Sequence, residues 1–197
     1  MVKSLCTIPN LLSGFRLFSV PVLLFFAWRG SVKEFLVLLV SALLSDLADG
    51  YLARRLHQES ELGARLDSWG DFALYITTPL CAWLLWPELI IREAAYVIVV
   101  LASFVLPILI GFVKYRRLTS YHTWGAKLSA VLMGCTTLLL FMGGPAFPFH
   151  LATIVLVFTQ IEEICITIVL PAWRANVPSL VHALRLARKG GFDSGPE

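Results

Sequence analysis

Residues 45–75 read SDLADGYLARRLHQESELGARLDSWGDFALY, and long apolar runs flank this stretch on both sides. It contains four aspartates, Asp46, Asp49, Asp67 and Asp71. Placing one acid inside a transmembrane helix costs about 2.5–3.5 kcal/mol on insertion scales, so acids in such a setting usually have a function. The question is therefore what four carboxylates hold beside apolar runs of this length.

The composition is that of a membrane protein. Of the 197 residues, 58% are hydrophobic and 15% are charged, whereas soluble domains have about 45–50% and about 25%. The apolar residues form blocks near the roughly 20 residues that cross a bilayer as a helix. These blocks lie at roughly 9–28, 33–56, 64–86, 92–115, 123–143 and 148–171. We therefore predict an all-α integral membrane protein with six transmembrane helices.

The basic residues predict the orientation of these spans. All but three of the 16 lysines and arginines fall on one side of a six-span arrangement, the exceptions being Arg29, Lys33 and Arg92. The positive-inside rule then places both termini and the Asp-rich stretch in the cytoplasm. We expect a six-span domain over residues 1–175 and a cytoplasmic amphipathic tail over 176–197, with 178–189 forming a short interfacial helix. The net charge of +3 is too small to indicate a nucleic-acid partner.

The spacing of the aspartates predicts that their side chains converge. Asp46 and Asp49 are three residues apart, and Asp67 and Asp71 are four apart, so each pair shares one helical face. The polar turn between the two spans lets these faces meet at the cytoplasmic level. Four carboxylates repel one another, and hard divalent cations such as Mg²⁺, Mn²⁺ or Ca²⁺ prefer such oxygen ligands. Three nearby arginines could also offset part of the negative charge: Arg54, Arg55 and Arg65. The alternative to a metal site is therefore an ion-paired helix end without further function.

Small residues accompany the acids. Gly50 and Ala53 follow Asp49, and Gly63 precedes Asp67 by one helical turn. Small side chains let another backbone or a ligand approach closely, although helix packing explains Gly50 and Ala53 equally well when they are taken alone. Arg54 offers a cation to a phosphate group. Together with the acids, these residues favour a ligand cleft.

The stretch resembles the signature of the CDP-alcohol phosphotransferase (phosphatidyltransferase) family. The match holds at every fixed position of Asp46-x2-Asp49-Gly50-x2-Ala53-Arg54-x8-Gly63-x3-Asp67-x3-Asp71. The N-terminal IPNLLSGFRL is also similar to the opening segment of the family, through Pro9, Asn10, Ser13 and Arg16. The resemblance covers most of the chain, to about residue 175.

This resemblance implies a reaction and a set of partners. A substituted phosphoryl group would pass from a CDP-linked lipid, such as CDP-diacylglycerol, to the hydroxyl of a small polar alcohol, releasing CMP in phospholipid biosynthesis. The resemblance also implies a homodimer among membrane lipids. We expect it in a bacterial inner (plasma) membrane, with the active site facing the cytoplasm.

The resemblance also assigns roles to residues. Asp46, Asp49 and Asp67 would bind two divalent metals, Mg²⁺ or Mn²⁺, while Asp71 would join the second metal and act as general base on the acceptor hydroxyl. Two metals neutralise a pyrophosphate and stabilise charge on the attacking and leaving oxygens. The nucleotide cleft would be formed by Asn10, Gly50, Ala53, Arg54 and Gly63.

The acceptor alcohol is left open by the sequence. Ser68 and Phe72 stand where the branch that uses glycerol 3-phosphate typically has Pro and Lys, so the inositol-phosphate, serine and related branches remain in view. We expect the acceptor pocket to use Lys114, Arg116 and Lys127, although topology alone also accounts for basic residues at these places. Glu162 or Glu163 is expected to pair with a basic residue such as Lys127 or to contact the acceptor.

Two other classes of function compete with the enzyme. A divalent-cation or proton transporter would use the same acidic cluster, but its acids should be spread through the bilayer depth on several helices. A structural membrane subunit leaves the spacing of Asp, Gly and Arg unexplained. Release of CMP from CDP-diacylglycerol, with and without metal, separates these classes.

Overall fold

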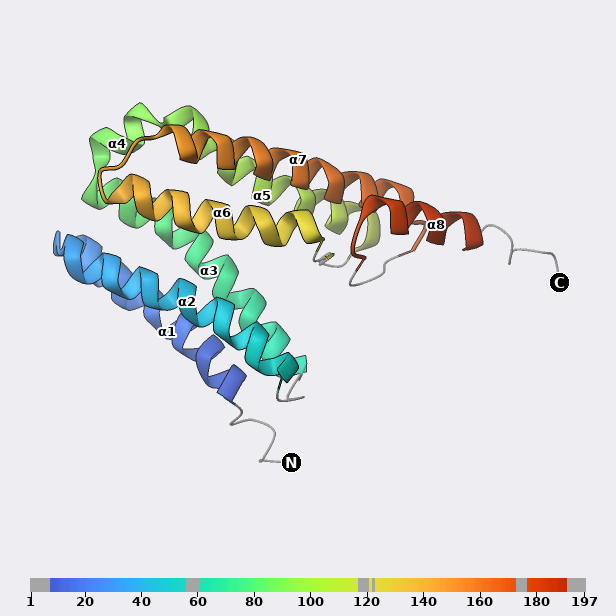
Figure 1. Ribbon diagram of the computed structural model, residues 1–197, viewed down its shortest axis with the longest axis horizontal. Coiled ribbons are helices and arrows are strands. Elements are labelled where there is room, and N and C mark those ends of the chain that lie inside the picture. Colours follow the sequence, from blue (N-terminus) through green and yellow to red (C-terminus); the bar gives the residue numbers. More distant parts are fainter. Residues whose placement is uncertain (1–7, 56–60, 117–120, 122, 173–176, 191–197) are drawn as a thin grey trace. The chain divides into compact units, whose positions relative to one another are not determined.

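The structure is a computed structural model that describes residues 8–55, 61–116, 121, 123–172 and 177–190. Side-chain positions within these ranges are described except at 8, 9, 47, 49–55, 61, 62, 64, 65, 67, 68 and 187–190. The described residues form α-helices and no β-strand, which confirms the all-α prediction. Their order is shown in Figure 1. They are α1 (Ile8–Trp28), α2 (Val32–Arg55), α3 (Glu61–Leu85), α4 (Pro87–Arg92), α5 (Ala94–Tyr115), α6 (Trp124–Phe141), α7 (Phe147–Val169) and α8 (Leu180–Gly190).

The long helices follow the predicted spans to within a few residues. The helix expected in the tail is also present, as α8. The short helix α4 was not predicted, because residues between the third and fourth apolar blocks were assigned to a break. Its local signals are nevertheless those of a helix: Pro87 is its first residue, Glu88 lies in the first turn and Arg92 in the last. These positions suit the fixed φ of proline and the helix dipole.

Among the described residues, four helices are long and apolar enough to cross a membrane. They cover Asn10–Trp28, Ala94–Tyr115, Trp124–Phe141 and Phe147–Val169. Helices α2 and α3 have 24 and 25 residues, long enough for a bilayer of about 30 Å, but they hold the charged stretch and are not among the four. The chain is thus an all-helical protein whose helices are consistent with a membrane location. Six spans and the orientation of the termini stay predictions.

Two glycines end helices at predicted breaks. Gly30 follows α1 with φ +70°, and Gly143 follows α6 with φ +84°. The amide of Ser31 donates to the carbonyl of Phe26, and that of Gly30 to Ala27, while Gly144 and Gly143 donate in the same way to Leu139 and Leu140. This is the Schellman pattern, in which glycine adopts the left-handed conformation without a Cβ penalty. The chain reverses locally at both places.

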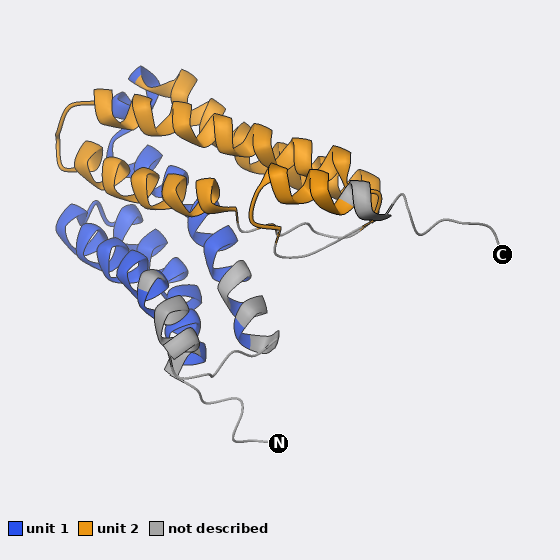
Figure 2. Cartoon of the chain, turned by 45° about the vertical axis from the view of Figure 1, so that its right-hand side comes forward, with its two compact units in different colours: residues 1–92 blue, residues 93–197 orange. Residues whose placement is uncertain are grey.

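The first of two compact units comprises residues 1–92 (Figure 2). In it α1 packs against both α2 and α3, and α4 follows α3. One face of α1 is buried along its length and changes character part of the way along. It carries polar residues in its first half and apolar ones in its second; the buried residues are Asn10, Ser13, Arg16, Ser19, Leu23 and Ala27. The polar half of this face is the part of α1 that positions the candidate site.

The second unit comprises residues 93–197 and is organised around α7, which packs against α5, α6 and α8. Helices α5 and α7 run parallel, since Glu93 bonds to His150 at their starts and Lys114 bonds to Thr167 at their ends. The end of α7 and the start of α8 share a small core of Tyr121, Ile166, Leu170, Val177 and Ala183. Helix α8 is therefore attached to α7 by buried apolar side chains.

Candidate active site

All four aspartates of the opening stretch lie on helices, as predicted. Asp46 and Asp49 belong to the last three turns of α2, and Asp67 and Asp71 to the first three turns of α3. The side chains of Asp46 and Asp71 are described, whereas those of Asp49 and Asp67 lie outside the described residues. Within the described set, no group of three His, Cys, Asp or Glu side chains is placed to hold a metal. Because that set lacks two of the four aspartates, the predicted metal site stays a prediction.

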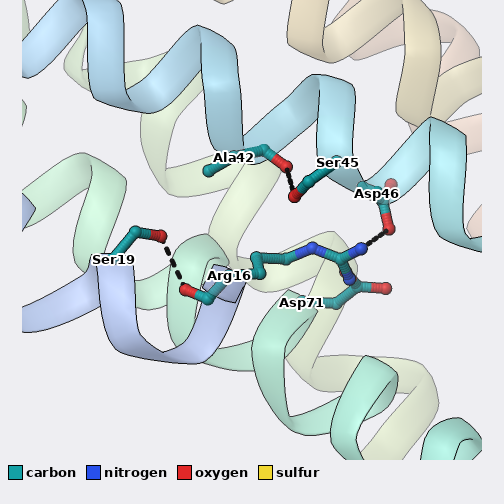
Figure 3. A network of polar contacts seen from close by, with 6 residues as sticks. All are labelled: Arg16, Ser19, Ala42, Ser45, Asp46 and Asp71. Carbon is teal, nitrogen blue, oxygen red and sulfur yellow. Dashed lines mark hydrogen bonds and ion pairs between the residues drawn. The ribbon is translucent and has the colours of Figure 1, made fainter. Parts of the chain in front are cut away.

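Arg16 joins the two described aspartates. Its Nη2 lies 2.8 Å from Asp46 Oδ1 on α2, and its Nη1 lies 2.8 Å from Asp71 Oδ1 on α3. Figure 3 shows the guanidinium reaching from α1 to both carboxylates. One planar cation on a third helix thus brings together acids that are far apart in the sequence, and charge-assisted bonds of this length are among the stronger hydrogen bonds in proteins.

The burial of the three side chains is unequal. The Arg16 side chain is 0% exposed, whereas those of Asp46 and Asp71 are 39% and 53% exposed. A buried cation is costly unless it is paired and hydrogen-bonded, which accounts for the two short contacts. The guanidinium therefore approaches the carboxylates from the protein interior, and both carboxylates also reach the surface.

The neighbours of Arg16 make room for its aliphatic stem. Gly70 is buried, and a Cβ at this position would lie 3.3 Å from Arg16 Cδ. The hydroxyl of Ser19 donates to the backbone carbonyl of Arg16 (2.7 Å), and that of Ser45, one residue before Asp46, donates to the carbonyl of Ala42 (2.7 Å). Each of these two hydroxyls therefore donates to a backbone carbonyl of its own helix.

Sequence reasoning did not identify Arg16 as the partner of the acids. It proposed Arg54, Arg55 and Arg65, whose side chains lie outside the described residues. The signal for Arg16 was present in the sequence, because it is the only charged residue of α1.

The donor chemistry of the site fits a divalent cation. Asp46 and Asp71 supply carboxylate oxygens from two helices to one place, and both side chains are partly exposed. Hard cations such as Mg²⁺ prefer oxygen ligands of this kind and usually retain several waters. These residues are therefore able to contribute to a metal site, together with the predicted ligands Asp49 and Asp67.

The residues predicted for the nucleotide cleft are described only in part. Asn10 is buried on the first turn of α1, six residues before Arg16. Gly63 lies on α3 and is partly exposed, while Gly50, Ala53 and Arg54 belong to the last turns of α2, outside the described side chains. Nucleotide binding stays a prediction for all five.

The residues predicted for the acceptor pocket belong to the second unit, where two of them have structural partners. Lys114 Nζ donates to the carbonyls of Thr167, Ile168 and Leu170 at 2.8, 2.8 and 2.9 Å, and so caps the C-terminus of α7. Lys127 Nζ lies 5.4 Å from the centre of the Trp124 ring, a cation–π contact. Arg116 follows α5 with φ 55° and is exposed. Acceptor binding stays a prediction for these three residues.

Glu162 has a partner that the sequence did not predict. Its Oε1 accepts a hydrogen bond from the backbone amide of Leu180, the first residue of α8, over 3.0 Å. In the part of the chain that is described, neither Glu162 nor Glu163 forms an ion pair with Lys127. A carboxylate at a helix N-terminus satisfies an otherwise unpaired amide and complements the helix dipole. The structure therefore places Glu162 at the attachment of α8.

The sequence was compared with models of known protein families, and one of them matches most of the chain. The family model of the CDP-alcohol phosphatidyltransferases matches residues 6–171. The matched segment begins before α1 and ends just after α7, so α8 lies outside it. Both helices that carry the aspartates and the helix that carries Arg16 fall within it.

Similar bacterial proteins have related names. A cardiolipin synthase (CMP-forming) of Streptomyces coelicolor is 44% identical over 90 residues, covering 43% of this chain and 41% of its own length. A CDP-diacylglycerol–glycerol-3-phosphate 3-phosphatidyltransferase of Aquifex aeolicus is 39% identical over 64 residues, covering 32% and 36%. A putative cardiolipin synthase of Mycobacterium tuberculosis is 37% identical over 75 residues, covering 38% and 36%. The matches thus span about two fifths of the curated relatives, and no solved structure gives a significant match.

Proposed function

The chain belongs to the CDP-alcohol phosphatidyltransferase family, and we propose that it transfers a phosphatidyl group from a CDP-linked lipid to an alcohol, releasing CMP. The observation that carries this proposal is the joining of Asp46 and Asp71, the first and last aspartates of the signature, by the Arg16 guanidinium. A residue of α1 thus bonds to one carboxylate from α2 and one from α3, and the residue types and spacing of these acids match the family signature.

The proposed chemistry has one bond formed and one broken. The acceptor hydroxyl oxygen attacks the phosphorus of the phosphatidyl group, and the bond from this phosphorus to the CMP oxygen breaks. Asp71 takes the hydroxyl proton as general base, a role that requires its carboxylate within hydrogen-bond reach of that hydroxyl. An exposed fraction of 53% leaves this side chain open to an incoming alcohol.

All four aspartates, Asp71 included, are proposed to bind the metal ions that hold the donor. Asp46, Asp49, Asp67 and Asp71 are the proposed ligands of two Mg²⁺ or Mn²⁺ ions. When bound, such ions neutralise the pyrophosphate and stabilise the charge that develops on the attacking and leaving oxygens. Arg54 is proposed to bind a donor phosphate beside Gly50, Ala53, Gly63 and Asn10. Phosphoryl transfer then depends mainly on positioning and electrostatics.

The names of the relatives favour a glycerol hydroxyl as the acceptor. One relative is named for glycerol 3-phosphate and two for cardiolipin, a lipid in which a glycerol links two phosphatidyl groups. Ser68 and Phe72 depart from the pattern typical of the branch that uses glycerol 3-phosphate. We therefore propose that the glycerol headgroup of phosphatidylglycerol is the preferred acceptor, with glycerol 3-phosphate second.

The membrane arrangement completes the proposal. Six spans with both termini in the cytoplasm place the acids at the cytoplasmic surface, where a donor with a soluble nucleotide and lipid tails can reach them. A homodimer in a bacterial inner membrane is expected from the family resemblance.

Release of CMP from CDP-diacylglycerol in detergent tests the proposal. The assay compares phosphatidylglycerol, glycerol 3-phosphate, inositol phosphate, inositol and serine, each with Mg²⁺, with Mn²⁺ or with a chelator. We expect metal-dependent CMP release with phosphatidylglycerol above the other acceptors. If no alcohol gives metal-dependent CMP and Asp71→Asn changes nothing, the chain is not a phosphatidyltransferase, and ion flux in liposomes becomes the measurement for the transporter alternative.

A further inference from the structure

We propose that Arg16 is a positioning residue for the metal site: it holds the side chains of Asp46 and Asp71 in the orientation that binds divalent cations. This inference rests on the proposed function, because it takes these two aspartates as metal ligands. It adds a fixed cation on α1 to a site otherwise built from α2 and α3.

The geometry favours a permanent role for this cation. The contacts with Asp46 and Asp71 use different nitrogens of the guanidinium, so each of these carboxylates is held by its own donor at 2.8 Å. The Arg16 side chain is 0% exposed, so it has no direct path to solvent when another cation arrives at the exposed side of the acids. A planar guanidinium fixes the direction of both bonds, which a point charge such as a lysine ammonium does not.

Gly70 supplies an independent indication that the position of Arg16 matters. It lies on α3 one residue before Asp71, and a side-chain carbon there would lie 3.3 Å from Arg16 Cδ and 3.7 Å from Cβ and Cγ. A Cβ at this position would press on Arg16 Cδ, which would have to shift by a few tenths of an ångström to admit it. Helix α3 thus supplies both the space for the Arg16 stem and one of its carboxylate partners, Asp71.

The physical consequence is preorganisation of the carboxylates. Two neighbouring carboxylates repel each other, and free rotation of their side chains would have to be lost on metal binding. The guanidinium offsets the repulsion and fixes one oxygen of each carboxylate. Groups that hydrogen-bond metal-binding carboxylates generally change metal affinity or activity by about 10–100-fold when they are removed.

Metal binding without substrate tests the inference directly. The protein is purified in detergent and titrated with Mn²⁺, and free Mn²⁺ is followed by electron paramagnetic resonance. We expect Arg16→Gln to bind Mn²⁺ about 10–100-fold more weakly, with Arg16→Lys between Arg16→Gln and the wild type because it keeps the charge but not the fork. Melting temperature and size-exclusion chromatography in chelator establish which variants are folded.

Two further variants separate positioning from general damage. Gly70→Ala keeps every charge and has the higher helix propensity of alanine. Its Cβ would press on the arginine stem, so we expect a stable protein with several-fold weaker Mn²⁺ binding. Ser45→Ala removes a buried hydroxyl that lies one residue before Asp46 and donates to the carbonyl of Ala42, and we expect unchanged Mn²⁺ affinity. If Arg16→Gln does not fold, Arg16→Lys and Gly70→Ala decide the question.

Equal Mn²⁺ affinity, within twofold, in the wild type, Arg16→Lys and Gly70→Ala would overturn the inference. Its failure differs from a failure of the proposed function. Metal-dependent CMP release together with unchanged Mn²⁺ affinity in the variants keeps the reaction and removes the role of Arg16. Weaker Mn²⁺ binding in the variants without CMP release by the wild type keeps the positioning role and removes the reaction.

Discussion

Glu162 on α7 accepts a hydrogen bond from the backbone amide of Leu180, the residue at which α8 begins. Ser179 Oγ accepts a second, longer bond from the amide of His182, so two of the first amides of α8 have side-chain partners. The helix lies outside the segment matched by the family, yet it is attached to the last helix of that segment by a charge-assisted bond and by the buried Ala183. This attachment leads to the first prediction.

Glu162→Ala should loosen α8. Loss of a hydrogen bond to a charged acceptor costs about 1.5–3 kcal/mol, which corresponds to roughly 10–150-fold faster amide exchange where α8 opens locally. Hydrogen–deuterium exchange of the peptide covering 180–190 measures this change. Glu163→Ala is the matched control, because no bond of its side chain to α8 is present among the described residues. Equal protection of α8 in the two variants would show that Glu162 does not hold it.

Lys114→Met should destabilise the protein through the end of α7. The lysine donates to three carbonyls of that helix terminus, which have no partners within the helix. Because Lys114 is exposed, we expect a modest loss of about 1–2 kcal/mol, measured as a lower melting temperature. Lys114 is also predicted to bind the acceptor, and the KM for the acceptor tests this role. An unchanged KM in the folded variant argues against acceptor binding. Lys127→Met, which removes a cation above Trp124, serves for comparison.

Gly125→Ala should be destabilising because α6 and α7 approach closely there. A Cβ at Gly125 would lie 2.8 Å from Thr159 Cγ2, and overpacking of this kind typically costs about 1–3 kcal/mol. Thr159→Ser removes that methyl and keeps the hydroxyl that bonds to Ser129, so the double variant should recover most of the loss. Thermal unfolding of the wild type, the two single variants and the double variant gives the coupling free energy between the two positions. Gly14→Ala, at a position with open space around the Cβ, should be neutral or slightly stabilising.

Asp71→Asn should reduce turnover far more than it reduces stability. Asparagine keeps an oxygen that accepts from Arg16 Nη1, but it cannot take the proton of the acceptor hydroxyl. Removal of a general base typically lowers kcat about 10²–10⁴-fold. The initial rate of CMP release at saturating metal measures this effect, and Ser45→Ala is the folded comparison. Wild-type turnover in Asp71→Asn would assign the proton transfer to another group.

The sequence alone was sufficient for the helices and their approximate ends. Apolar runs near 20 residues predict long helices, and the glycines after Trp28 and Met142 end two of them through local backbone geometry. Position along the chain also predicted which acids share a helical face. The short helix α4 was missed because its few residues lie between two apolar blocks, where local capping signals carried less weight than hydropathy.

The contacts of single polar side chains needed the tertiary structure. Arg16 and Asp71 are 55 residues apart, Lys114 and Thr167 are 53 apart, and no periodicity within one helix connects such pairs. The sequence determined that this protein has apolar helices of membrane-spanning length and that two neighbouring helices carry the four aspartates. It could do so because helix formation and hydropathy are local properties. Only the packing of α1 against α2 and α3 decided that Arg16 faces the acids, since a buried charge takes the partners that its neighbouring helices bring within reach.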